Sequence, residues 1–136
     1  EVIQDRPTIA SILEANPTEK WTANEYLDLK AIRDLAAGKG FKRQLLTGEE
    51  TRCGTIGRYY AKKRSTEPFL VNAQGLERLF TPAEHAAVKS IPAHLIASGI
   101  SKTTAHEILG QSVDYRQPLK LGLALFASLK LGVIAA

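Results

Sequence analysis

The spacing of apolar residues near the N-terminus predicts one long amphipathic helix. Between residues 23 and 37, apolar side chains recur every three or four positions and give a helix one apolar face: Tyr26, Leu29, Ile32, Leu35 and Ala36. Thr22 and Glu25 have the spacing of a capping box at its start, and Gly38 stands where a left-handed C-terminal cap belongs. Residues 8–14 are expected to form a short helix or turn before it.

The pattern changes after residue 40, where glycines and Pro68 separate short β-prone runs at residues 55–56, 59–60 and 69–71. Glycine and proline residues between β-prone runs are typical of short strands joined by long loops. Residues 72–75 are expected to form a turn.

Three helices are expected in the C-terminal part. Thr81 and Glu84 form a second capping box, with proline at the first helical position, and open a helix to about residue 89. Ser101 caps a helix that ends at Gly110, and residues 118–131 form the last one. The predicted order is helix, irregular β-rich middle, then three helices, which is a mixed α+β fold.

The composition fits one compact domain or two small ones. Of 136 residues, 44% are hydrophobic and 24% are charged, which excludes a disordered chain. One cysteine allows no internal disulfide, and no closely spaced set of metal ligands appears, so we expect no metal and a reducing cytoplasmic setting. We expect neither a signal peptide nor a membrane span. The absence of methionine and the start at Glu1 indicate a piece of a larger protein.

Positive charge is concentrated in the middle of the chain. Residues 38–64 contain eight basic residues and two acidic ones, whereas the flanking segments are close to neutral. A basic patch of this kind suits a phosphate backbone, although a solvated basic loop is the simpler alternative. The interleaved Phe41, Tyr59 and Tyr60 favour nucleic acid.

Enzyme signatures are mostly missing, because no glycine-rich phosphate loop and no zinc-protease motif occurs. Cys53 follows Arg52, which could activate a thiol, but no base can be named beside it, and an ordinary turn residue is the favoured interpretation. Residues 95–109 are similar to the turn and second helix of a helix-turn-helix, with Gly99 in the turn. A small DNA-binding regulator is therefore an alternative, and a non-enzymatic interaction domain is another.

Several short segments occur in a characteristic order. Residues 8–14 and 19–21 precede Gly-Lys-Gly-Phe at 38–41 and Arg-Tyr-Tyr at 58–60, which is followed by Lys62. Arg-Leu-Phe-Thr-Pro-Ala-Glu at 78–84, Pro92, Thr-Thr-Ala at 103–105 and Gly-Gln-Ser-Val at 110–113 complete the order. Together they resemble the C-terminal part of a bacterial, Dcm-like cytosine-C5 DNA methyltransferase, namely its target-recognition region and last two conserved motifs.

The resemblance implies an enzyme that transfers a methyl group from S-adenosylmethionine to C5 of a flipped cytosine in double-stranded DNA. It implies a loop-rich, short-stranded recognition region over residues 1–76. Over residues 77–136 it implies helices that pack on a Rossmann-like catalytic domain missing from this chain. The catalytic cysteine and the main cofactor loop lie outside these residues, so none of them is assigned a catalytic role and the fragment alone is expected to be inactive. A cytoplasmic restriction-modification setting is the corresponding expectation.

The resemblance also assigns roles to individual residues. The DNA-binding residues would be Lys42, Arg43, Arg58, Tyr59, Tyr60, Lys62, Lys63 and Arg64. Among them, Arg58 is the candidate for a bidentate guanine contact, and the lysines would grip phosphates. The turn at Gln111, Ser112 and Val113 would line the methionine end of the cofactor. A structural role is implied for Arg78, Thr81, Glu84 and Gly110.

Overall fold

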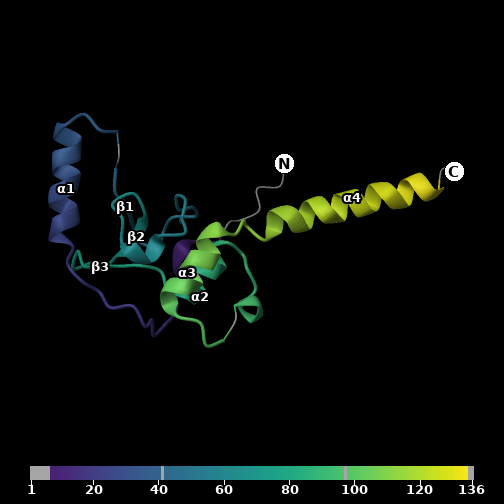
Figure 1. Cartoon of the computed structure of the whole chain (residues 1–136), viewed down its shortest axis with the longest axis horizontal. Helices are drawn as coiled ribbons and strands as arrows, with labels where there is room; N and C mark the ends of the chain where they lie inside the picture. The colour runs from purple at the N-terminus through teal and green to yellow at the C-terminus, as the bar shows by residue number, and fades with distance from the viewer. Residues whose placement is uncertain (1–6, 41, 97, 135–136) are drawn as a thin grey trace.

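The computed structural model describes residues 7–40, 42–96 and 98–134. Its 3-10 helices are η1 (Ile9–Ile12), η2 (Tyr60–Lys62) and η3 (Ala93–Leu95). Its strands are β1 (Gln44–Leu46), β2 (Pro68–Val71) and β3 (Glu77–Arg78), and its α-helices are α1 (Glu25–Ala36), α2 (Pro82–Val88), α3 (Lys102–Gln111) and α4 (Arg116–Ile134). In Figure 1 the sheet, α2 and α3 form a central body, with α1 at one end and α4 extending away at the other. The fold is mixed α+β, as the sequence predicts.

The small sheet has the order β1-β2-β3. β1 pairs parallel with β2, and β2 pairs antiparallel with β3. The parallel pair requires a long connection, and residues 47–67 provide it. The predicted turn at 72–75 and the strand at 69–71 are confirmed: the Asn72 side chain accepts hydrogen bonds from the backbone N–H groups of Gln74 and Leu76, and Gly75 has a φ of 74°. β3 was not predicted, because a strand of two residues is too short to show an alternation of apolar and polar positions.

Tyr60 occupies the centre of the core, although its run at 59–60 is β-prone. It begins η2 instead of a strand, and its side chain is fully buried. Its hydroxyl donates to the carbonyl of Pro68 (2.8 Å) and accepts from the N–H of Phe80 (3.0 Å). The hydroxyl therefore ties η2 to β2 and to the segment before α2. The buried apolar cluster around it contains Ile9, Leu27, Leu46, Ile56, Phe69, Leu70, Leu79 and Phe80.

The start of α1 differs from the prediction. Thr22 exchanges backbone hydrogen bonds with Glu77 in an isolated antiparallel bridge, which occupies the carbonyl that an N-cap residue offers to its helix. The predicted capping box at Thr22 is therefore wrong, and α1 starts at Glu25, after an Asn24 whose side chain makes no capping bond. Gly38 does adopt a left-handed φ of 70° after the helix.

The apolar face of α1 points to solvent. The buried contact of the helix is made by Leu27, which is 8% exposed. The periodic apolar residues are 59% to 70% exposed: Tyr26, Leu29, Ile32 and Leu35. The apolar face is therefore present as predicted, but α1 packs against the rest of the fold through its other side, at Leu27.

A buried ion pair joins β3 to α2. The Arg78 guanidinium donates two hydrogen bonds to the Glu84 carboxylate (2.6 and 2.8 Å), and both side chains are at most 2% exposed. The same carboxylate accepts the N–H groups of Thr81 (2.8 Å) and Glu14 (2.9 Å). The Thr81 hydroxyl accepts from the N–H of Glu84 (3.2 Å), so the predicted capping box, with Pro82 at the first helical position, is confirmed.

Two buried histidines join α2 to α3. His85 and His106 are both fully buried, and their Nδ1 atoms lie 3.0 Å apart. One ring must donate and the other accept, so at least the accepting ring is neutral. Both Nε2 atoms are buried without a hydrogen-bond partner among the described residues. Burial lowers the pKa of both imidazoles, and for His85 the neighbouring His106 adds to the effect.

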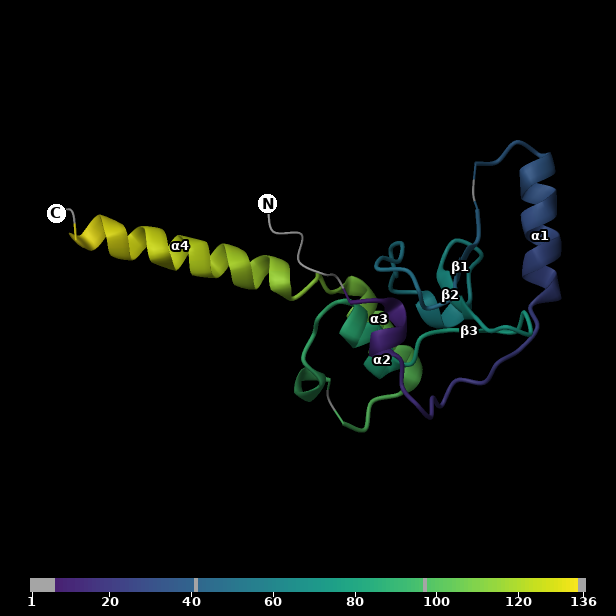
Figure 2. The ribbon, with the colours of Figure 1, turned by 180° about the vertical axis from the view of Figure 1, so that it is seen from behind.

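α4 is longer than predicted and leaves the body entirely, as Figures 1 and 2 show from opposite sides. The leucines of α4 whose side chains the structure describes are 47% to 69% exposed: Leu119, Leu121, Leu123, Leu125 and Leu129. Among the described helices, none combines the length and the hydropathy needed to cross a membrane.

The division of the chain at residue 76 stays a prediction. The sheet crosses this boundary, because β3 pairs with β2.

Replacing Glu84 by Gln should destabilise the fold by roughly 3–5 kcal/mol, because it leaves the Arg78 charge buried without its counter-ion. Urea unfolding followed by circular dichroism measures this. The control is Asp34→Asn, which breaks the exposed pair with Lys39 and should cost less than about 1 kcal/mol. Equal losses in the two variants would contradict the structural importance of the buried pair.

The stability of the chain should fall as the pH drops below the ordinary histidine pKa of about 6.5. The unfolded histidines bind protons there, whereas His85 and His106 stay neutral in the fold because their pKa values are lowered. Each contributes a slope of up to about 1.4 kcal/mol per pH unit. Urea unfolding between pH 7.5 and about 5 measures this slope. Replacing both residues, by Leu and Phe respectively, should flatten it, whereas replacing the exposed His94 by Gln should not.

Candidate nucleic-acid interface

Three cations surround one aromatic ring on the surface. The Tyr59 ring, in a side chain that is 37% exposed, has the guanidinium of Arg58 at 4.9 Å, the ammonium of Lys62 at 4.7 Å and the guanidinium of Arg64 at 4.5 Å from its centroid. We call these four residues the Tyr59 cluster. Cations over a ring face gain electrostatic attraction to the π-system, which holds them together despite their mutual repulsion.

The segment that bears the Tyr59 cluster is anchored at its base. The N–H of Gly57 donates to the buried Glu67 carboxylate (3.2 Å), which closes the segment between the two residues. The buried Tyr60 side chain fixes its middle, and Lys63 adopts a left-handed φ of 51° that turns the chain back. The cluster therefore sits on a folded surface and not on a free loop.

α3 lies directly beneath this segment. A Cβ at Gly110 would overlap the backbone of Gly57 and Arg58, so glycine is required for this close approach. One turn earlier, His106 packs edge-on against the Tyr60 ring with centroids 5.1 Å apart. Glu107 forms an ion pair with Arg58. Sequence reasoning missed Glu107, because it lies 49 positions from Arg58 and no local pattern links them.

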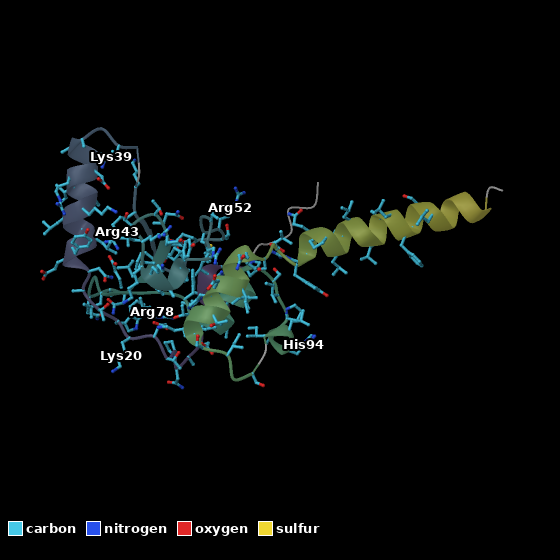
Figure 3. All side chains as sticks on the ribbon, viewed as in Figure 1. Lys20, Lys39, Arg43, Arg52, Arg78 and His94 are labelled. Carbon is cyan, nitrogen blue, oxygen red and sulfur yellow. The ribbon has the colours of Figure 1, made fainter. Side chains whose placement is uncertain are left out.

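Two residues predicted to bind DNA have structural positions instead. The Arg43 side chain is 7% exposed and donates two hydrogen bonds to Glu77 (2.9 and 2.5 Å) and one to Asp28. Figure 3 shows it between α1 and the sheet, whereas Arg52 points outward. Tyr60 is fully buried. These positions do not favour the predicted DNA contact for either residue, since a buried side chain presents no surface to a ligand.

The remaining predicted contacts lie on the surface. Lys42, Lys63, Lys62, Arg64 and Arg58 are exposed. Of the three cations of the cluster, Arg58 forms an ion pair with Glu107; within the residues the structure describes, Lys62 and Arg64 form none. The cluster thus carries more positive charge than its protein neighbours neutralise, which is the electrostatic requirement for binding a phosphate backbone.

Cys53 is not poised as a nucleophile. Burial raises the pKa of its thiol, which packs against the core cluster. The described residues also contain no group of three His, Cys, Asp or Glu side chains suited to a metal ion.

The turn predicted to face a cofactor is preformed. The Lys89 ammonium donates to the carbonyl of Leu109 (2.5 Å) and to that of Ser112 (3.0 Å), and so closes the end of α3. Gln111 and Val113 are exposed on this turn, Val113 to 67%.

The helix-turn-helix interpretation of residues 95–109 does not fit the structure. The segment before Gly99 forms only the three-residue η3, where the motif requires a helix. Moreover, α3 buries His106 against α2 and leaves Ile108 55% exposed, although the motif would place Ile108 inside. The regulator alternative therefore lacks its structural basis.

Replacing Gly110 by Ala should destabilise the chain by about 2 kcal/mol or more, because the new methyl group meets backbone that cannot rotate away. It should also disturb the Tyr59 cluster. The matched control is Gly122→Ala in α4, where nothing lies within 4 Å of the added Cβ and alanine should gain about 0.5–1 kcal/mol of helix stability. Thermal unfolding of both variants checks the difference; a tolerated Gly110→Ala would contradict the close approach.

Solved structures with a similar fold exist, although the sequence comparisons find no match. No protein-family model and no curated protein matches the sequence. Among solved structures, the chain is similar to the Dnmt2 methyltransferase of S. pombe with a TM-score of 0.70 and 19% identity, over 95% of this chain and 44% of that one. It is similar to the Entamoeba histolytica methyltransferase EhMeth with a TM-score of 0.66 and 19% identity, over 93% and 42%. A DNMT2 variant of Spodoptera frugiperda gives 0.63 and 19%, over 88% and 42%. The chain thus has the fold of one part of these methyltransferases and spans less than half of their length.

Proposed function

We propose that this chain is the target-recognition region and C-terminal segment of a cytosine-C5 methyltransferase that acts on nucleic acid, double-stranded DNA being the substrate that the sequence motifs favour. The observation that carries the proposal is the fold match, which covers 95% of this chain and 44% of a Dnmt2 methyltransferase. The ordered motifs at residues 58–62, 78–84 and 110–113 also support it.

The Tyr59 cluster is the part of the surface best suited to the nucleic acid. Guanidinium groups bind phosphate oxygens with paired hydrogen bonds, and Arg58 can bind a guanine edge in the same way. Lys62 and Arg64 offer cations without a protein counter-ion in the described chain, and Tyr59 offers a ring for stacking. Lys42 and Lys63 are also exposed and would add phosphate contacts.

α4 is the surface best suited to the rest of the enzyme. Its leucines occur on more than one side of the helix, and a helix apolar nearly all round is normally buried. The similar structures are more than twice the length of the matched part. A catalytic domain outside this chain, packed around α4, would remove this apolar surface from water.

S-adenosylmethionine would supply the methyl group, and the turn after α3 is the part of this chain that fits it. Gln111 and Val113 are exposed, and the carbonyl of Ser112 is held by Lys89, so the turn keeps its shape without a ligand. A cofactor carried mainly by the catalytic domain could therefore contact these residues without refolding the turn. The catalytic nucleophile would come from the same domain, since the Cys53 thiol is held neutral by burial.

The test is binding of a short fluorescein-labelled DNA duplex by fluorescence anisotropy over a salt series. Lys62→Ala and Arg64→Ala should each lower affinity and make the slope of log K against log salt shallower by about 0.9, the value for one lost phosphate contact. Lys20→Ala, an exposed lysine outside the cluster, is the control and should change neither. Failure of the unmodified chain to bind at low salt would overturn the proposed interface.

A further inference from the structure

The Arg58–Glu107 ion pair is part of the proposed interface. Among the described residues, Arg58 is the cation of the Tyr59 cluster that has an acidic partner, and that partner comes from α3, beneath the segment that bears the cluster. The two side chains are 47% and 37% exposed, so water reaches both. Exposed ion pairs contribute little to stability, because solvent screens them and both side chains lose rotamer freedom. The pair can therefore open at low cost when a stronger anion arrives.

A phosphate competes for the same donors as the Glu107 carboxylate. Both ligands present anionic oxygens to the planar guanidinium, whose N–H groups bind either one with charge-assisted hydrogen bonds. The hydrogen bond to Glu107 raises the pKa of Arg58, and a phosphate would do the same, so the guanidinium stays charged throughout. Tyr59 holds Arg58 at 4.9 Å from its ring centroid and can keep it in place while the anion changes.

We propose that Glu107 is a positioning residue that holds Arg58 against Tyr59 in the unbound chain, in the place that a nucleic-acid phosphate takes on binding. The inference rests on the proposed function of the Tyr59 cluster. Glu107 thus sets two properties: the position of Arg58, and the free energy needed to break the ion pair before Arg58 can bind a phosphate. Removing the carboxylate charge removes that cost, so affinity rises although a contact is lost.

The Glu107→Gln variant tests this, since glutamine keeps the length of the side chain and a hydrogen-bond acceptor but no charge. With the full chain and a short fluorescein-labelled DNA duplex, the variant should bind about two- to fivefold more tightly at low salt. Its salt slope should be steeper by up to about 0.9, because Arg58 releases one more counterion when no carboxylate is left behind. A residue with a purely structural role would instead lower affinity when substituted.

Two controls separate this exchange from a general charge effect. Asp114→Asn opens a similar exposed pair, with Arg116, and changes the net charge by the same amount outside the cluster. It should leave affinity almost unchanged. In an Arg58→Ala background, Glu107→Gln should produce no gain, because the double-mutant cycle then lacks the group through which Glu107 acts. Thermal unfolding of each variant shows that the fold is kept.

The outcomes distinguish the two hypotheses. If the unmodified chain binds duplex but folded Glu107→Gln binds equally or more weakly, the inference fails while the proposed interface stands. A gain that persists without Arg58, or that Asp114→Asn reproduces, also overturns the inference. If the unmodified chain binds no duplex at low salt, the proposed interface fails and this inference fails with it.

Discussion

The Glu84 carboxylate is the group on which the rest of the structure depends. It accepts four hydrogen bonds: two from the Arg78 guanidinium and one each from the N–H groups of Thr81 and Glu14. These donors bring together the end of β3, the start of α2 and the segment after η1. Because both charges are buried, removing one would leave the other without compensation, which is far more costly than losing an exposed pair. The motif at residues 78–84 is therefore a structural one, and its position next to Tyr60 and the histidine pair extends this rigidity toward α3.

Sequence patterns predicted local structure well where the deciding contacts are local. The caps at Thr81 and Ser101 each bond a backbone N–H three residues further on, so a short window of sequence contains both partners. The same spacing predicted a cap wrongly at Thr22, because the backbone of Thr22 is hydrogen-bonded to Glu77, 55 positions away, in a β-bridge. A window of a few residues cannot reveal such a competitor. The two-residue β3 was missed for the same reason: it exists only through its neighbour β2.

The candidate site shows a similar limit. Arg43 and Arg64 are equivalent in the sequence, since both are basic residues in the same charged segment. Their environments separate them: Glu77 and Asp28 enclose the Arg43 guanidinium, whereas Arg64 stays exposed over Tyr59. Tyr59 and Tyr60 divide in the same way, one outside and one in the core. Charge density could thus locate the patch, but only the fold decides which side chains are available to a ligand.

α3 connects features that the sequence presents as separate motifs. Along one side of this ten-residue helix, His106 supports Tyr60, Glu107 pairs with Arg58 and Gly110 admits the backbone of Gly57 and Arg58. At its end, Lys89 fixes the carbonyls of Leu109 and Ser112 in the turn proposed to face the cofactor. The side chain of Gln111 donates to the carbonyl of Glu107 (3.2 Å), so the two regions meet within one helical turn. A displacement of α3 would therefore alter the Tyr59 cluster and the turn together, since both contact this helix.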